Sequence, residues 1–271
     1  MIKEPFKDFL YGLLTGLTTT IPGISFGALA MLFNIYEKFI NAFSRENIKK
    51  SLPFLIPFFV GCGCSIFLFS RLVAHLLAEY DIAMYFGFIG LILGCVPMIY
   101  RKAEYSKIKI GNVALFSAAL AFMVLVVLMN DNSIGNKAIE EFEGDLPVLL
   151  IWIFCAGFAS AVAIVIPGLS GSVILLMLGS YEITIGAIST LNIPILLAVG
   201  GGIVLGMLAG IKLIKMLIAR HREALYSVVL GLVIGSVFII YPGFEFGPQG
   251  VAAIIMAAGF AVISYLFSKK A

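Results

Sequence analysis

Long apolar runs separated by short polar segments dominate the pattern of this chain. Six of these runs approach or exceed the roughly 20 residues that a membrane-crossing helix needs. They cover residues 52–79, 82–100, 111–130, 194–218, 224–240 and 250–267. Two further apolar blocks, 9–43 and 148–190, are each interrupted by a Pro-Gly pair. The pattern predicts six membrane spans and two interrupted helical segments.

The two interruptions have related sequences, IPGISFG from Ile21 and IPGLSGS from Ile166. Proline removes a backbone donor and clashes with a continuing helix, and the glycine that follows loosens the backbone further. A new helix can then start with Ser25 or Ser170 as its N-cap. Within a bilayer, such a break is tolerated only where it is buried in protein or lines a wet cavity. We therefore predict a re-entrant helical hairpin for each block, with the two breaks forming a paired binding site.

The two halves of the chain match each other at constant offsets. The offset is 145 residues for Pro22/Pro167, Tyr36/Tyr181 and Glu37/Glu182, and 141 residues for Arg71/Lys212, Tyr85/Tyr226, Gly90/Gly231, Gly94/Gly235 and Tyr100/Tyr241. Because a hairpin returns to its own side, each half crosses the membrane three times, so the second copy must be inverted. The prediction is an all-α polytopic membrane protein with an inverted repeat, each half a re-entrant hairpin plus three transmembrane helices. The first repeat is 1–131, an acidic external linker is 132–146, and the second repeat is 147–271.

The distribution of basic residues gives the predicted orientation. All 18 lysines and arginines fall on the side that holds both termini, except Lys137, Arg71 and Lys212. Cytoplasmic loops are enriched in lysine and arginine, so both termini are predicted to be cytoplasmic. The composition, 61% hydrophobic and 12% charged, excludes a soluble domain, because soluble chains carry about 25% charged residues. We expect a multi-pass protein of the cytoplasmic membrane without a removable signal peptide, and no nucleic-acid partner.

The four cysteines, Cys62, Cys64, Cys95 and Cys155, all lie in apolar runs. None forms a CxxC pair, and the chain has only two histidines to support a metal site. We therefore expect no metal ion and no cofactor.

Two basic residues lie deep within predicted spans. Arg71 is nine residues from the turn at Tyr80, and Lys212 is eight residues from Arg220, about 12–13 Å along a helix. A charge at that depth costs at least roughly 2.5 kcal/mol and therefore faces a cavity or a partner. The start of a helix after each break adds backbone N–H groups and a positive dipole end. Two cations and two such helix starts predict an anionic substrate.

Glu37 and Glu182 are placed twelve residues beyond Ser25 and Ser170. If each helix continues, the carboxylates lie about 18 Å from the breaks, near the opening of each hairpin. One interpretation is an interfacial carboxylate beside a tyrosine. The other is a proton carrier in the transport cycle, with His75, one turn beyond Arg71, as a further titrating candidate.

The doubled Pro-Gly-x-Ser motif, followed each time by Tyr-Glu eleven residues after the serine, resembles the PopT-type undecaprenyl-phosphate translocases. The resemblance covers essentially the whole chain. It implies a transporter that returns undecaprenyl phosphate from the external to the cytoplasmic leaflet for peptidoglycan and other cell-wall synthesis. Where that family has glycine and threonine after the serine, this chain has Phe26 and Ala28 in the first copy, and Ser172 and Val173 in the second. The phosphate-binding residues we predict are Gly23, Ser25, Gly27, Gly168, Ser170, Gly171 and Ser172, with Arg71 and Lys212 as counter-charges.

A lateral opening would hold the phosphate in a polar cavity and leave the polyprenyl tail in the membrane lipid, and an inverted repeat would supply alternating access. The alternatives are an ion-coupled transporter or a channel for a small soluble anion. A proton or a sodium ion is the candidate coupling ion. An enzyme acting on lipid phosphates would need converging acid and base groups, whereas His75 and His221 are far apart, so we predict no enzymatic activity. The sequence leaves the oligomeric state open.

Overall fold

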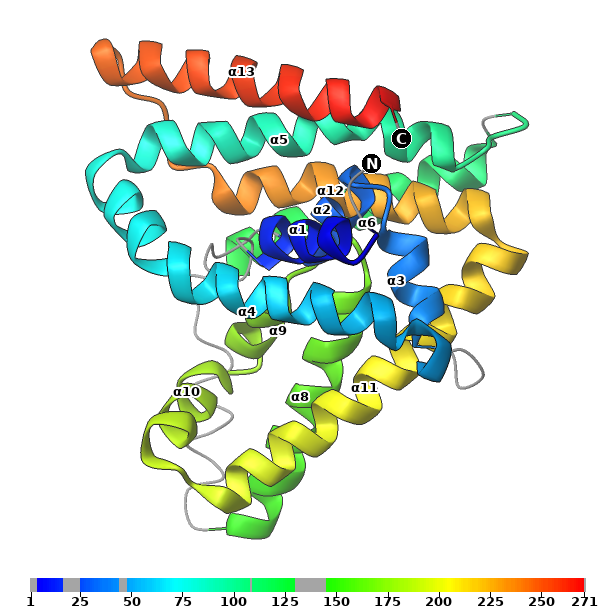
Figure 1. Cartoon of the computed structure of the whole chain (residues 1–271), viewed down its shortest axis with the longest axis vertical. Coiled ribbons are helices and arrows are strands. Elements are labelled where there is room, and N and C mark those ends of the chain that lie inside the picture. The colour runs from blue at the N-terminus through cyan, green and yellow to red at the C-terminus, as the bar shows by residue number, and fades with distance from the viewer. Residues whose placement is uncertain (1–3, 17–24, 44–47, 108, 130–144, 271) are drawn as a thin grey trace.

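The computed structural model describes residues 4–16, 25–43, 48–107, 109–129 and 145–270 (Figure 1). Within these ranges the regular structure is entirely helical. The helices are α1 (Glu4–Gly16), α2 (Phe26–Leu32), α3 (Tyr36–Ala42), α4 (Ile48–Glu79), α5 (Asp81–Lys102), α6 (Ile110–Met129), α8 (Leu146–Val165), α9 (Gly171–Met177), α10 (Tyr181–Thr190), α11 (Ile193–Arg220), α12 (Arg222–Ile240) and α13 (Pro248–Lys270).

Seven of the described helices are long and apolar enough to cross a membrane. Six of them, α4, α5, α6, α11, α12 and α13, occupy the ranges predicted as spans. The seventh is α8, which was predicted as one arm of a re-entrant hairpin. It runs for 20 residues without a charged side chain, starting directly after the N-cap Asp145, so it is long enough to cross by itself. The chain is a polytopic helical membrane protein, and the inverted arrangement of its halves stays a prediction.

Each half contains a second helix break that the sequence analysis did not predict. Helix α2 ends after seven residues and is followed by Asn34 with a left-handed backbone (φ 56°). Helix α9 also ends after seven residues and is followed by Gly179 (φ 63°). In each case two backbone bonds close a Schellman motif, such as Ile35 N–H to the Ala30 carbonyl at 2.9 Å. The predicted continuous helix from Ser25 to Glu37 is therefore wrong. Glu37 lies in the first turn of a separate helix, α3, and α10 bends away from α9 by 111°.

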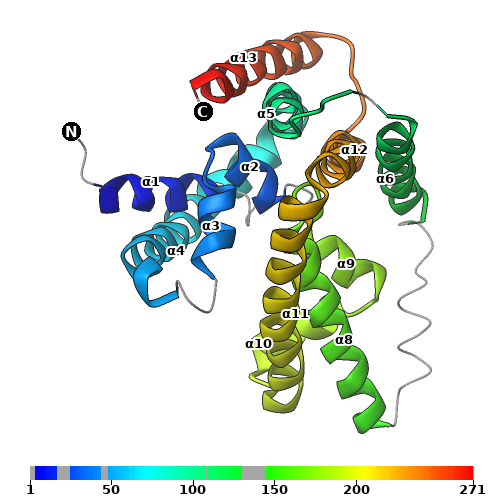
Figure 2. The ribbon, with the colours of Figure 1, turned by 90° about the vertical axis from the view of Figure 1, so that its right-hand side faces the viewer.

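The helices associate in pairs: α1 with α4, α5 with α13, α6 with α12, and α8 with α11 (Figures 1 and 2). Glycine permits each close approach. A Cβ at Gly90 would overlap the Ala257 carbonyl oxygen, and a Cβ at Gly202 would overlap the Phe154 carbonyl oxygen. Glycines at a spacing of four continue these contacts at Gly16, Gly94, Gly206, Gly210 and Gly235. Membrane helices lack a hydrophobic driving force between them, so this backbone proximity supplies much of their association.

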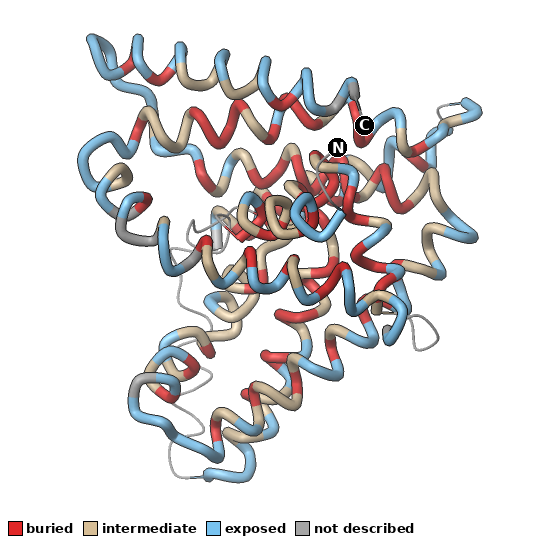
Figure 3. Tube along the Cα trace, in the orientation of Figure 1, coloured by how far each residue is buried: buried red, intermediate tan, exposed pale blue. Residues whose placement is uncertain are grey.

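The buried residues lie where α2, α3, α5 and α12 meet, while the outer faces of α4, α11 and α13 are exposed (Figure 3). Tyr36 and Tyr226 are among the largest fully buried side chains. The exposed outer faces carry large apolar side chains such as Leu205 on α11 and Ile255 on α13. A membrane protein presents such a surface to lipid. The core therefore surrounds the broken helices α2 and α3, which lie inside the bundle.

Candidate functional site

The two helix breaks contact each other at the centre of the bundle. The Gly168 N–H donates a hydrogen bond of 3.1 Å to Ser25 Oγ, across 143 residues of sequence. Ser25 is only 3% exposed. A Cβ at Gly27 would lie 2.7 Å from Pro167 Cα, so only glycine fits between the breaks. The structure thus brings together Ser25, Gly27 and Gly168, three of the predicted site residues. Pro22 and Gly23 lie outside the described residues.

Ser25 and Ser170 occupy the N-cap positions of α2 and α9, both with extended backbone. Neither side chain makes the expected capping bond to its own helix. The Ser25 hydroxyl binds Gly168 instead, and the Ser170 and Ser172 hydroxyls lie 2.8 Å apart. The first-turn N–H groups of α9 are therefore not capped by the Ser170 side chain.

Two predicted glycines hold the second break in shape. Gly168 has φ 93°, and a Cβ there would lie 2.7 Å from the Val233 backbone nitrogen on α12. The Gly171 carbonyl accepts a 2.9 Å hydrogen bond from the buried Ser160 hydroxyl of α8. These contacts fix the break against α8 and α12.

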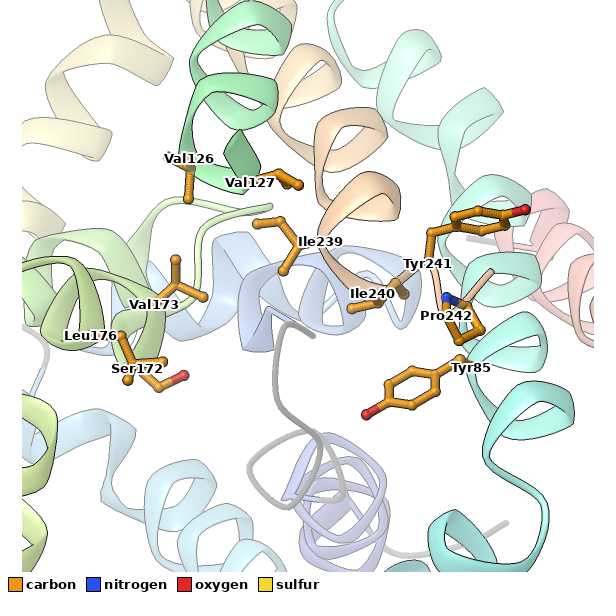
Figure 4. Close-up of a pocket in the computed structure, with 10 residues that line it drawn as sticks. All are labelled: Tyr85, Val126, Val127, Ser172, Val173, Leu176, Ile239, Ile240, Tyr241 and Pro242. Carbon is orange, nitrogen blue, oxygen red and sulfur yellow. The ribbon is translucent and has the colours of Figure 1, made fainter. Parts of the chain in front are cut away.

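A pocket of about 380 Å³, which we call the α9 pocket, reaches this break from one side (Figure 4). Its lining residues come from α5, α6, α9, α12 and the segment after α12: Tyr85, Val126, Val127, Ser172, Val173, Leu176, Ile239, Ile240, Tyr241 and Pro242. In Figure 4 the hydroxyls of Ser172 and Tyr85 point into the space between them, whereas the Tyr241 hydroxyl points away. Among the predicted site residues that the structure describes, Ser172 lies in this lining.

Tyr85 was not predicted as a site residue. The sequence did offer a signal for it, because Tyr85 matches Tyr226 in the repeat. Both tyrosines lie near the ends of predicted spans, and these spans also carry matched glycines. The phenol adds a second hydroxyl to the α9 pocket, which is otherwise largely apolar.

Glu37 belongs to a group of polar side chains that we call the Glu37 cluster. Its Oε1 accepts hydrogen bonds from Arg222 Nη2 at 3.4 Å and from the Tyr226 hydroxyl at 3.2 Å. Lys102 Nζ lies 3.9 Å from the same oxygen. Lys102 also donates to the side-chain oxygen of Asn34, in the break before α3. The cluster therefore connects α3 to the end of α5 and the start of α12.

Two further bonds strengthen this end of the bundle. Arg222 Nε donates to the Lys102 carbonyl at 2.7 Å. The buried Tyr36 hydroxyl, next to Glu37, donates to the Val165 carbonyl at the end of α8 at 2.7 Å. Residues of both halves are thus bonded together around α3. Glu37, for which the sequence left an interfacial carboxylate and a proton carrier as alternatives, is an ion-paired carboxylate here, and a role in proton coupling stays a prediction.

Glu182, His75 and Lys212 have exposed side chains and do not line the α9 pocket. Glu182 lies in the first turn of α10, His75 on α4 and Lys212 on α11. Arg71 lies within α4, but its side chain is outside the described part of the structure. The assignment of Arg71 and Lys212 as counter-charges therefore stays a prediction.

Three comparisons place these features beside known proteins. A family model, VCA0040-like and described as undecaprenyl phosphate translocase-like, matches residues 15–247. A polyprenyl-phosphate transporter of Staphylococcus aureus is 30% identical over 252 residues, which is 89% of this chain and 88% of that protein. A polyprenyl-phosphate transporter of Vibrio cholerae is 28% identical over 252 residues, or 87% and 77% of the two chains. No solved structure matches. Both relatives are named as transporters, which agrees with the prediction of a non-enzymatic protein.

Proposed function

The chain belongs to the undecaprenyl phosphate translocase-like family, and from that premise we propose that it carries polyprenyl phosphate across the cytoplasmic membrane. The family resemblance of the two Pro-Gly-x-Ser motifs is thereby confirmed. In this proposal the lipid moves from the external to the cytoplasmic leaflet and is reused in cell-envelope polymer synthesis. Both termini are cytoplasmic, as the distribution of lysine and arginine favours.

The observation that carries the proposal is the hydrogen bond between the two breaks, from the Gly168 N–H to Ser25 Oγ. It supports a single central site built from both halves of the chain. The Ser170 and Ser172 hydroxyls and the first-turn N–H groups of α9 are donors for a phosphate that enters the α9 pocket. Arg71 and Lys212 supply positive charge when the substrate is bound, because an anion in a bilayer needs a counter-charge.

The difference between the two ends of the bundle supports alternating access as the mechanism. On the predicted cytoplasmic side, the Glu37 cluster joins α3, α5 and α12. At the repeat-related positions, Glu182, which matches Glu37, is exposed, and Tyr85, which matches Tyr226, lines the α9 pocket. This asymmetry supports a state that is closed toward the cytoplasm and open on the external side. Opening the Glu37 cluster would release the phosphate inward.

The helix pairs also support the inverted repeat on which this mechanism depends. Helix α5 packs on α13 of the other half, and α12 packs on α6. The additional break at Asn34 is repeated at Gly179, again 145 residues later. A duplicated chain with this exchange of partners provides two nearly equivalent conformations.

Substituting Ser172 by alanine tests the proposed phosphate site. The variant removes a hydroxyl that lines the α9 pocket, and a hydrogen bond to a charged group contributes about 1.5–3 kcal/mol. We expect transport of undecaprenyl phosphate between the leaflets of proteoliposomes to slow about tenfold or more. Ser117→Ala, at an exposed position of α6, is the matched control and should keep the native rate.

The same assay decides between the proposed substrate and the alternative. Native leaflet exchange no faster than in empty liposomes would exclude lipid transport, and uptake of inorganic phosphate would then favour a small-anion carrier or channel. Arg71→Ala and Lys212→Ala belong in the same series. Native rates in both variants would remove the two cations from the site.

Glu37→Gln is predicted to weaken the closed cytoplasmic side. The carboxylate is about one-third exposed, so each of its ion pairs contributes no more than about 1 kcal/mol. We expect the rate of thiol labelling, at a cysteine placed at the cytoplasmic end of α3, to rise roughly fivefold in Glu37→Gln and to stay unchanged in Glu182→Gln.

Transport of undecaprenyl phosphate should also be measured from pH 5 to pH 8 in both variants. A pH dependence equal to that of the native protein would exclude proton coupling through these carboxylates.

A further inference from the structure

A second cavity, which we call the α2 groove, lies beside the first broken helix. Its volume is about 350 Å³, and it is bounded by α1, α2, α4, α5 and α13. Among the described residues, every side chain that lines it is aliphatic, aromatic or sulfur-containing. A cavity without polar partners does not hold ordered water, but it accepts hydrocarbon.

The α2 groove is close to the central site in two ways. Ser25, where the breaks are bonded together, is the N-cap of α2, and Leu29 within this helix and its C-cap Phe33 line the groove. On α5, the consecutive residues Met84 and Tyr85 line the groove and the α9 pocket respectively. The two cavities therefore border the same turn of α5, and a ligand that filled both would need a polar end and an apolar part.

The outer wall of the groove faces the membrane. Helix α13 forms this wall, and its side away from α5 is exposed along most of its length (Figure 3). Ile263 and Phe267 line the groove and are still 48% and 52% exposed. The Phe267 ring packs edge-on against Phe33, the C-cap of α2, with 6.1 Å between the centroids. A hydrocarbon chain in the groove would thus reach lipid past the apolar side chains of Ile263 and Phe267.

We propose that the α2 groove binds the isoprene units of the substrate that are nearest to the phosphate. The inference rests on the proposed function, since it assigns the tail of the same lipid. The described lining of the groove is apolar, the groove shares α5 with the head-group site, and its outer wall borders the bilayer. These are the properties that a polyprenyl chain attached to a phosphate requires. Its apolar burial would add affinity for the tail that the phosphate contacts cannot give.

Two leucines of α5 provide a matched pair of variants. Leu91 is half-buried and lines the groove, whereas Leu93, two residues later, is 47% exposed on another face of the helix and lies outside that lining. Leu91→Trp fills the groove, and Leu93→Trp adds the same side chain toward lipid. We expect undecaprenyl phosphate transport in proteoliposomes to fall about tenfold in Leu91→Trp and to stay near the native rate in Leu93→Trp. Equal rates in the two variants would overturn the proposal.

Photo-crosslinking of the native protein gives a test that needs no variant. The probe is a polyprenyl phosphate with a diazirine on the isoprene unit next to the phosphate, compared with a phosphatidylglycerol that carries the same group. We expect peptides of α2, α5 and α13 to be labelled by the polyprenyl probe at about tenfold the level of the phospholipid probe. Equal labelling, or labelling elsewhere while transport is intact, would overturn the tail assignment alone. If the native protein does not transport the lipid, the proposed function itself fails.

Discussion

Replacing Gly27 by leucine is expected to abolish transport. Gly27 is the point at which the two breaks touch, because a Cβ there would lie 2.7 Å from Pro167 Cα, which is backbone and cannot rotate away. The leucine would separate the breaks and remove the bond between Gly168 and Ser25, leaving a buried N–H group without a partner. Overpacking and the lost hydrogen bond together cost about 3 kcal/mol, which corresponds to about a hundredfold loss of the assembled site.

The control for this substitution is Gly63→Leu. A Cβ at Gly63, within α4, meets no other atom within 4 Å, and leucine favours a helix more than glycine does. Leaflet exchange in proteoliposomes and thermal unfolding in detergent should be measured for both variants. Native exchange by Gly27→Leu would show that the contact between the breaks is not needed for transport.

Gly202→Leu is expected to give the largest loss of stability. At Gly202 the backbones of α11 and α8 are in contact, so a side chain there would push the whole helix pair apart. Such pairs are held by close packing rather than by exclusion of water, so the packing energy along α8 is lost with the contact. We expect destabilisation by about 3 kcal/mol or more and a lower melting temperature in detergent.

The same helix supplies the control, because a Cβ at Gly200 has nothing within 4 Å. Gly200→Leu should therefore melt close to the native temperature. Similar melting temperatures for the two leucine variants would contradict the close packing of α8 and α11. A lower melting temperature in Gly200→Leu alone would place the contact on the other face of α11.

Six of the seven long apolar helices and the break at Pro167 could be predicted from the sequence because local chemistry determines both, whereas α8 was predicted as one arm of a hairpin. A bilayer requires apolar runs of fixed length, and a proline ends a helix whatever surrounds it. The sequence also carried a local signal for the break at Asn34, since asparagine, like glycine, readily adopts the left-handed conformation that ends a helix. It was missed because the apolar pattern continues across it.

By itself, then, the sequence determined a polytopic helical membrane protein, its family and the position of the break at Pro167-Gly168. Only the tertiary structure decided which segments meet. The bond from Gly168 to Ser25 and the contact of Glu37 with Arg222 join residues that are 143 and 185 positions apart. Such contacts depend on how helix pairs pack through their glycines, and no local pattern specifies the partner. The same reason explains why Tyr85 and the α2 groove emerged from the structure alone.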